Sequence, residues 1–420
     1  MTPGAHIPAS APDSAATRHA RADAGAAPGA RKLHLLAYGH PLDPRTFSGY
    51  SANLGQALRR AGMLGEALNI RDFRATDALR RAFIPRRLLP RPRIDVDRRW
   101  LWSREGHAVL SRRLARRLDV MGLTGPFLQV GTLATTPPER GPHAMLTDMT
   151  IAQARRAGRF GFEGFTDRQA EQAMEAQRRI MSTAAHVFTL SRWTAESVIA
   201  DCGVPGRLVT VVHAGSNLAI PEDLHEARRP REILFVGIDW ERKGGPLLLE
   251  AFRIVRDALP DATLTIVGCR PAIDEPGVRI EGFLSRSAPD EFVRLARCYA
   301  RAACFCLPAL FDPFPNVIIE AASVGLPTVA LDSGSRREAI DDGVTGRLTP
   351  IAAEPSARLL AEDLIAVIAD EERCLAMGRA AKRRADDLFT WERVIERIER
   401  TMWPGTLDAE PDPRHAGRTT

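Results

Sequence analysis

Two acidic residues, Asp312 and Glu320, stand eight positions apart in this chain, and the amide side chain of Asn316 lies between them. Carboxylates accept hydrogen bonds from hydroxyl groups. If Asn316 lies at the start of a helix, the free backbone amides and the helix dipole at that end favour an anion. We therefore expect this segment to bind a molecule with a phosphate in its middle and hydroxyl groups on both sides.

The residues around this pair predict a strand, a loop, a helix and a second strand. Apolar runs occupy 304–308 and 328–332, and the apolar residues of 317–324 recur at helical spacing. Ligands of open α/β sheets bind outside the carboxyl ends of the strands. This places Asp312 at such an end and Glu320 one turn into the helix. The alternative is that Asp312 is an ordinary turn residue and Glu320 a solvated helix residue.

A second loop, 241–245, is charged and ends in glycine, and it follows the buried-strand pattern of 233–236. It carries Lys243, whereas nearly all other positive charge in the chain is arginine; the remaining lysines are Lys32 and Lys382. A compact ammonium suits a cluster of phosphate oxygens. We predict that Lys243 contacts phosphate, and the alternative is a solvated loop lysine.

The segment 311–327 resembles the signature of retaining glycosyltransferases of family 4, in which seven residues separate two Glu. Here Asp312 replaces the first Glu, and Pro315 stands where the family usually has Gly. The resemblance implies an α/β architecture of the GT-B type, with two facing Rossmann-like domains and a cleft between them. It also implies that Asp312 contacts the donor sugar, Glu320 the ribose and Lys243 the diphosphate. Because the side chain of Asp is one methylene shorter than that of Glu, we expect this replacement to affect the choice of donor more than the class of reaction.

The resemblance extends in the correct order over about 231–350. Ile238 occupies the position where the family often has an Arg. Arg242, which is adjacent to Lys243, is a candidate substitute. The donor-binding residues that the resemblance implies are Gly237, Arg242, Gly268, Phe283, Phe314, Pro315, Asn316 and Val317.

The N-terminal half offers fewer candidates. The resemblance implies that Ser48 and Gly49 face the donor phosphates and the acceptor, although both also suit a helix cap without any function. Asp148 ends a predicted strand and is a candidate to face the cleft. His107, in an Arg-rich helix predicted at 103–118, is expected to be a surface residue. His143 is expected to be structural.

A chain of 420 residues can hold two α/β domains. We predict a disordered extension (1–31), an acceptor domain (32–217), a donor domain (231–388), a helix that packs back across the domains (389–403) and a disordered tail (404–420).

No apolar run approaches ~20 residues, so no membrane-spanning helix is expected. The N-terminus lacks the apolar region of a secretory signal. The six cysteines show no metal-binding spacing. Cys304 and Cys306 alternate along a predicted strand and so face the same side, which predicts core thiols rather than a zinc site and favours a reducing cytoplasm.

The net charge of +6 and the isoelectric point near 9.3 raise the question of anionic partners. Residues 71–99 are rich in Arg and Pro with interspersed apolar residues, which suits either the inner face of an anionic membrane or a solvated loop. Nucleic-acid binding is not expected, since no basic motif with interleaved aromatic residues and no zinc module is present.

The resemblance implies transfer of a sugar from a nucleotide-diphosphate sugar to a glycan or lipid-linked acceptor, with retention of the anomeric configuration. It implies no metal and no further cofactor. Lys243 and the amides near Asn316 would stabilise the leaving diphosphate. Since no residue stands out as a nucleophile, a front-face mechanism is expected. The alternatives are a nucleotide-sugar epimerase or hydrolase of the same fold, or a non-catalytic sugar-nucleotide-binding partner.

Overall fold

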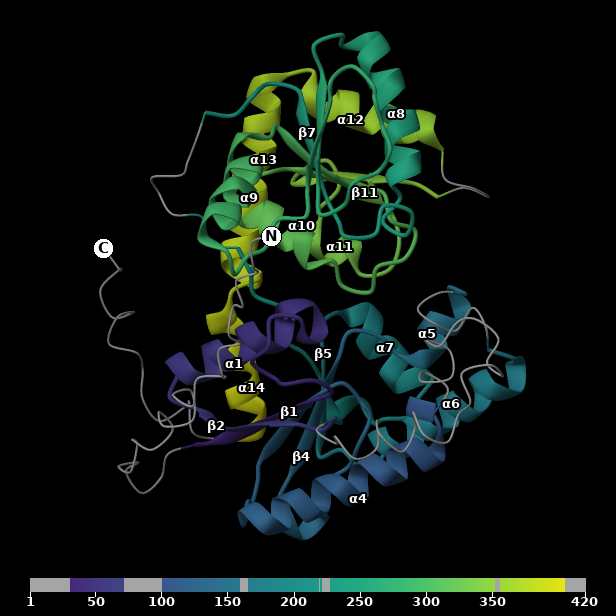
Figure 1. Cartoon of the computed structure of the whole chain (residues 1–420), viewed down its shortest axis with the longest axis vertical. Coiled ribbons are helices and arrows are strands. Elements are labelled where there is room, and N and C mark those ends of the chain that lie inside the picture. Colours follow the sequence, from purple (N-terminus) through teal and green to yellow (C-terminus); the bar gives the residue numbers. More distant parts are fainter. Residues whose placement is uncertain are drawn as a thin grey trace, which may run out of the picture.

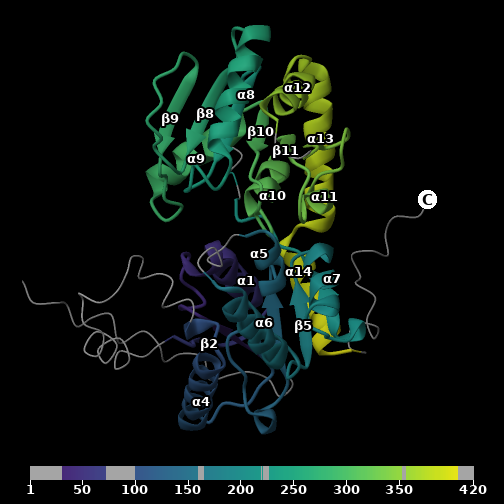
Figure 2. The same cartoon turned by 90° about the vertical axis from the view of Figure 1, so that its right-hand side faces the viewer.

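The computed structural model describes residues 31–71, 100–158, 165–218, 220, 227–351 and 356–404. Two six-stranded parallel sheets, each with its own helices, stack along the long axis of the molecule (Figures 1 and 2). The predicted terminal extensions, the Arg-rich stretch after residue 71 and most of the predicted linker at 218–230 lie outside the described residues.

The N-terminal sheet has the strand order β2-β1-β3-β4-β5-β6. Its strands are β1 (Leu33–Ala37), β2 (Leu64–Asn69), β3 (Phe127–Val130), β4 (His143–Thr147), β5 (His186–Thr189) and β6 (Val209–Val211). Its helices are α1 (Tyr50–Arg60), α4 (Arg104–Met121), α5 (Ile151–Arg156), α6 (Asp167–Met181) and α7 (Arg192–Ala200). Short 3-10 turns occupy Thr46–Gly49, Pro138–Arg140 and Gly206–Leu208.

The C-terminal sheet has the order β12-β11-β10-β7-β8-β9. Its strands are β7 (Glu232–Val236), β8 (Thr263–Val267), β9 (Val278–Gly282), β10 (Cys304–Leu307), β11 (Thr328–Leu331) and β12 (Gly346–Thr349). The helices are α8 (Gly245–Ala258), α9 (Pro289–Arg301), α10 (Asn316–Ser323), α11 (Arg336–Ala339), α12 (Ala357–Ile368), α13 (Glu371–Leu388) and α14 (Trp391–Met402).

Strands β7 and β10 are buried on both faces, which explains why their sequences read as continuous apolar runs. Ile233 and Phe235 of β7 belong to one hydrophobic cluster, and Leu234 belongs to another. In β10, Cys304 and Cys306 share a cluster, so the two thiols lie on the same face, as predicted from their alternation. All six cysteines are free.

The last helix, α14, returns to the N-terminal half and packs against α1 (Figure 1). The ring of Trp391 lies 5.1 Å from that of Tyr50, and its indole N–H donates to the Ser216 carbonyl at 3.0 Å. A Cβ at position 215 would collide with Trp391, so Gly215 allows this close approach. Arg397 also donates to the Val212 carbonyl at 3.0 Å.

A carboxylate of the C-terminal half caps a helix of the N-terminal half. The side chain of Glu338, in α11, accepts hydrogen bonds from the backbone N–H groups of Arg192 (2.8 Å) and Trp193 (3.1 Å) at the start of α7. Near this cap, the ring of Trp193 lies 5.9 Å from that of Phe311. A negative charge at a helix N-terminus is stabilising, so this contact helps to fix the two halves relative to each other.

Candidate functional site

The two loops that the sequence singled out lie at the point where the strand order of the C-terminal sheet reverses. Lys243 follows β7 and Asp312 follows β10, and these strands are neighbours. Crevices at such points are the usual ligand sites of doubly wound sheets. Gly244 adopts a left-handed conformation (φ 79°), and a Cβ there would collide with the Pro308 carbonyl. The loops are therefore in direct contact.

Lys243 and Asp312 form an ion pair between these loops. Their side chains are only 13% and 10% exposed. Removing one member of such a buried pair leaves the other charge without compensation, which is costly. The pair also means that a bound phosphate would compete with Asp312 for the ammonium group.

A cavity of about 450 Å³ opens between the two halves at this ion pair. Its lining unites residues that the sequence predicted from both halves, namely Ser48, Gly49, Lys243, Asp312, Phe314, Pro315, Asn316, Val317 and Glu320. It also contains residues that the sequence did not single out, among them Asn217 and Arg286.

The wall that the N-terminal half contributes is conformationally strained. Phe47, Ser48 and Gly49 all have positive φ (52°, 54° and 84°), which is uncommon for a bulky residue such as Phe47. Gly49 is the residue before α1, and the Ser48 side chain does not cap that helix. The start of α1 has no acidic residue in its first turn and lines the cavity with Gly49, Ala52 and Asn53, so the helix dipole adds a partial positive charge there.

The opposite wall is α10, which presents Asn316 at its start and Glu320 one turn later. Glu320 is 1% exposed and accepts hydrogen bonds from Tyr299 (3.0 Å) and Arg286 (2.7 Å). It is therefore not the solvated helix residue of the alternative reading. Among the described residues, Oδ1 of Asn316 and Oδ1 of Asn217 are buried without a hydrogen-bond partner. Two residues that line the cavity thus carry acceptors without a partner.

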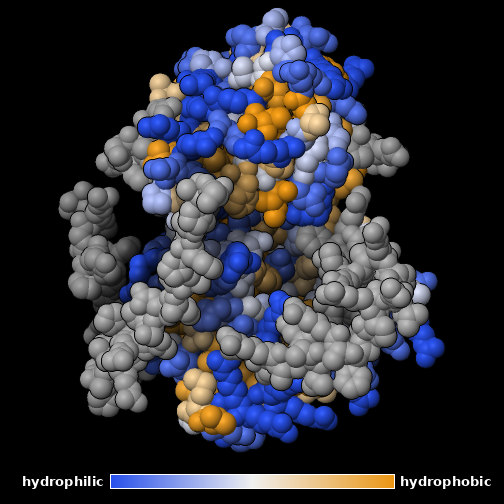
Figure 3. All heavy atoms as spheres, in the orientation of Figure 1, coloured by the Kyte–Doolittle hydropathy of each residue, from blue (hydrophilic) through white to orange (hydrophobic). Residues whose placement is uncertain are grey.

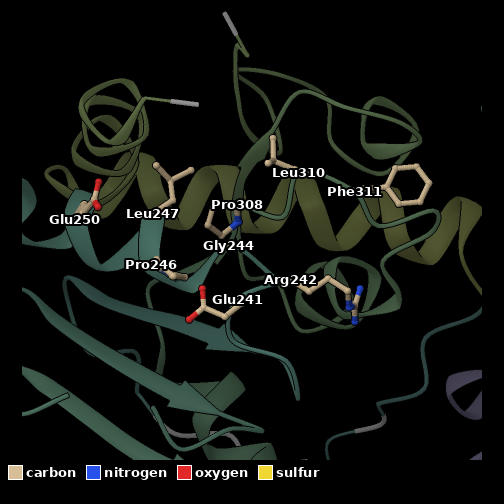
Figure 4. Close-up of a pocket in the computed structure, with 9 residues that line it drawn as sticks. All are labelled: Glu241, Arg242, Gly244, Pro246, Leu247, Glu250, Pro308, Leu310 and Phe311. Carbon is tan, nitrogen blue, oxygen red and sulfur yellow. The ribbon is translucent and has the colours of Figure 1, made fainter. Parts of the chain in front are cut away.

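Arg242 lies apart from the cavity that Lys243 lines. It pairs with Asp239 (3.5 Å) and lines a second cavity of about 290 Å³ together with Leu247 and Leu310 (Figure 4). Successive loop side chains point to different sides, and here they enter different cavities.

On the face of the molecule in Figure 3, apolar side chains gather on the C-terminal half.

The remaining donor candidates act through the backbone or lie apart from the cavity. A Cβ at Gly237 would approach Cγ of Lys243 to 3.0 Å, and a Cβ at Gly268 would lie 2.6 Å from the Gly237 carbonyl. These glycines let the ends of β7 and β8 approach the Lys243 loop. Phe283 is 64% exposed and does not line the cavity, so the structure does not place it with the other candidates.

Asp148 follows β4 and interacts electrostatically with Asp312 across the two halves. Burial disfavours its charged form and the Asp312 carboxylate repels it, and together they raise the pKa of Asp148 to about 7. Its backbone carbonyl accepts a hydrogen bond from the Thr194 hydroxyl. Asp148 is not among the residues that line the cavity, but its charge is coupled to the Lys243–Asp312 pair.

We expect Asp148→Asn to stabilise the protein, and increasingly so at higher pH. A carboxyl whose pKa is raised by folding makes the folded protein bind more protons than the unfolded chain between about pH 4 and about pH 7. Stability is lost as the pH rises through that window. The gain in Tm of Asp148→Asn over the parent should therefore be larger at pH 8 than at pH 5. The exposed Asp274→Asn is the matched control, and an equal gain at both pH values would argue against a raised pKa.

The expectation that His107 is a surface residue is wrong. Its side chain is buried, and its ring lies 6.1 Å from that of Trp102. It shares a face of α4 with Leu110 and Leu114, which pack against the sheet, and burial lowers its pKa to about 4. His143 is buried at the start of β4, and its Nδ1 accepts a hydrogen bond from the Thr136 amide at 3.3 Å.

No group of three or more His, Cys, Asp and Glu side chains is placed to hold a metal ion in the part of the chain that the structure describes. None of the helices within those residues is long and apolar enough to cross a membrane.

The model of the family "Glycosyl transferases group 1" matches residues 230–370. Phosphatidyl-myo-inositol mannosyltransferase of Mycobacterium tuberculosis is 33% identical over 181 residues, which are 41% of this chain and 47% of that protein. MMP alpha-(1->4)-mannosyltransferase of Mycolicibacterium hassiacum is 28% identical over 230 residues, 53% and 54% of the two chains. The chain thus matches about half the length of these curated relatives.

Solved structures resemble the chain over a longer range. Sucrose-phosphate synthase from Thermosynechococcus elongatus has a TM-score of 0.60 and 16% identity, over 89% of this chain and 98% of that one. HepE from Anabaena, solved with UDP and glucose, has a TM-score of 0.57 and 17% identity, over 89% and 99%. At such identities the likeness concerns the fold, and it confirms the predicted GT-B architecture of two Rossmann-like domains.

Proposed function

We propose that this chain, whose residues 230–370 match the model of the glycosyl transferases group 1 family, is a retaining glycosyltransferase. It moves a sugar from a nucleotide-diphosphate sugar to a glycan or lipid-linked acceptor. The observation that carries the proposal is the meeting of Lys243, Asp312 and Glu320 at one cavity between the two sheets.

The charges around the cavity suit the parts of such a donor. The ammonium of Lys243 and the N-terminal amides of α10 and α1 supply the positive field for a diphosphate. Asp312 lies on the sugar side and Glu320 on the ribose side, where carboxylates accept hydrogen bonds from hydroxyl groups. When a phosphate replaces Asp312 as the partner of Lys243, the Asp312 side chain becomes available to contact the sugar.

The proposed reaction breaks the bond between the anomeric carbon and the diphosphate oxygen while the acceptor hydroxyl attacks the same carbon. The electron pair of the broken bond stays on the diphosphate, which accepts the hydroxyl proton. The sugar passes through an oxocarbenium-like state, as in glycoside hydrolysis. The contribution of the protein is a fixed positive field at the oxygen on which negative charge develops. Attack from the face that the diphosphate leaves retains the anomeric configuration.

A thermal-shift screen of UDP-, GDP- and ADP-sugars tests this proposal. A ligand at ~100 times its Kd that binds only the folded protein adds ~2.7 kcal/mol of stability. We expect one nucleotide class to raise the Tm of the parent clearly, and to raise that of Lys243→Ala much less. If none of the nucleotide sugars raises the Tm of the parent protein, the cavity is not a donor site and the proposal fails.

Transfer is proposed to need no metal ion and no further cofactor, since Lys243 and the helix amides supply positive charge at the diphosphate. We expect activity to persist after exhaustive treatment with EDTA and removal of the chelate. Assays with added Mn²⁺ or Mg²⁺ provide the comparison. Complete loss of activity on chelation, with recovery when either ion is returned, would reject the metal-free mechanism.

A lipid-linked acceptor is supported by the similarity to a phosphatidyl-myo-inositol mannosyltransferase. The exposed positions of α4 in the N-terminal half include arginines such as Arg112 and Arg116. We propose that this domain binds the acceptor, and that its basic side contacts an anionic membrane at the inner face. Sedimentation with vesicles that contain or lack anionic lipid tests the contact, and equal binding to both would contradict it.

A further inference from the structure

One guanidinium connects three segments at the ribose side of the cavity. Arg286 lies between β9 and α9, and its Nη2 donates to Oε2 of Glu320 at 2.7 Å. Its Nη1 donates to the backbone carbonyl of Asn217, after β6, at 3.1 Å. Arg286 lines the cavity with its side chain 37% exposed, whereas the side chain of Glu320 is only 1% exposed. Arg286 therefore joins the buried carboxylate to the end of the N-terminal domain.

The contacts of Glu320 all fall on one of its two oxygens. The Tyr299 hydroxyl and Arg286 both donate to Oε2, and no described residue donates to Oε1. Burial opposes the charge on Arg286, but the Glu320 carboxylate outweighs this and raises the pKa of Arg286 above its usual value. Burial raises the pKa of Tyr299 well above its usual value, which keeps its hydroxyl proton available for the hydrogen bond.

We propose that Arg286 is a positioning residue of the nucleotide site. It orients the carboxylate of Glu320, so that Oε1 is free to accept hydrogen bonds from the ribose hydroxyl groups of the donor. The planar guanidinium suits this task because its two bonds, to Glu320 and to the Asn217 carbonyl, fix the plane of the group. This inference rests on the function proposed above.

A second observation supports a hydroxyl-binding corner at the same place. Oδ1 of Asn217 is buried without a partner among the described residues, and Asn217 lines the cavity. Buried polar atoms are normally hydrogen-bonded. Arg286 connects the segment that carries this second acceptor to Glu320, since it donates to the Asn217 carbonyl and to the Glu320 carboxylate. A ligand with adjacent hydroxyl groups satisfies both.

The test compares nucleotides that differ only in the ribose hydroxyl groups. The dissociation constants of UDP, GDP and ADP and of their 2′,3′-dideoxy forms are measured by calorimetry on the parent, Arg286→Met, Arg286→Lys and Glu320→Gln. A hydrogen bond to a charged group contributes about 1.5–3 kcal/mol, or roughly 10- to 100-fold in affinity. We expect the parent to prefer the ribose form by at least about tenfold. Arg286→Met should lose that preference by weakening the ribose form alone, and Arg286→Lys should retain part of it.

Arg294→Met is the matched control, because Arg294, in α9, pairs with Glu281 of β9 at 2.6 Å and does not line the cavity. It should keep the full preference. If Arg286→Met weakens both nucleotide forms equally, Arg286 holds the phosphates and the inference is overturned; an unchanged preference also overturns it. Should Arg286→Met fail to fold, Arg286→Lys decides, since it must show a reduced preference. If the parent binds none of the nucleotides, the proposed function fails first, and the inference fails with it.

Discussion

Replacing Lys243 with alanine is expected to lower turnover by a hundredfold or more. The loss of a single preorganised donor at a developing negative charge costs roughly 10²- to 10³-fold in kcat, and Lys243 carries a full positive charge at the proposed diphosphate site. The measurement is the release of nucleoside diphosphate from the donor under saturating conditions. A variant with activity within about a factor of two of the parent would remove Lys243 from the diphosphate site.

The structure changes what is expected for the stability of this variant. The sequence places Lys243 in a charged loop that need not support a core, which predicts unaltered folding. Since Lys243 pairs with the buried Asp312, Lys243→Ala leaves that carboxylate without compensation, and we expect Tm to fall by several degrees. The double variant Lys243→Ala/Asp312→Asn should recover much of the Tm and none of the turnover.

Lys382→Ala is the matched control for the loss of a lysine. Lys382 forms an exposed ion pair with Asp386 at 3.0 Å, and exposed pairs contribute little to stability. Turnover and Tm should both stay close to those of the parent. A comparable loss of turnover in Lys382→Ala would mean that the net charge matters rather than the position of Lys243.

Neutralising the two acids of the cavity is expected to have different effects. Glu320→Gln should weaken binding of the bare nucleoside diphosphate, because an uncharged amide is a poorer acceptor for ribose hydroxyl groups than a carboxylate. It also leaves Arg286 and Tyr299 without the carboxylate that both contact. The expected loss is about tenfold or more in affinity, measured by titrating the diphosphate against the variant.

Asp312→Asn should leave the affinity for the diphosphate unchanged or increase it. In the parent, a phosphate must compete with Asp312 for Lys243, and the variant removes that competition. Its turnover with the intact donor should nevertheless fall, because Asp312 is proposed to contact the sugar. If Asp312→Asn weakens the bare diphosphate as much as Glu320→Gln does, the assignment of the two acids to sugar and ribose is wrong.

Local pattern was sufficient to predict the segments that form the centre of the cavity. β10, α10 and β11 lie close to where the apolar runs place them, and Lys243 and Asp312 meet because their strands flank the reversal of strand order. The boundaries were less exact: the apolar runs at 304–308 and 328–332 form the strands Cys304–Leu307 and Thr328–Leu331, each one residue shorter. A short strand is defined by pairing with its neighbours, which a single sequence does not display.

Contacts between distant segments explain what the sequence did not predict. Arg286 reaches Glu320 across 34 positions and Asn217 across 69, and its own surroundings in the sequence resemble any loop between a strand and a helix. The arginines around His107 indicate a surface residue, but its spacing to Leu110 and Leu114 is that of a buried face. Glu338 caps a helix of the other domain through a contact that spans 146 positions of the sequence.

The most direct test of the central claim is the anomeric configuration of the first product, followed by proton NMR with the donor that the screen selects. The proposed mechanism predicts that the transferred sugar keeps the configuration it had in the donor, with nucleoside diphosphate released in equal amount. Release without transfer to an acceptor would favour a hydrolase. A transferred sugar with the opposite configuration at its anomeric carbon would contradict retaining transfer in this cavity.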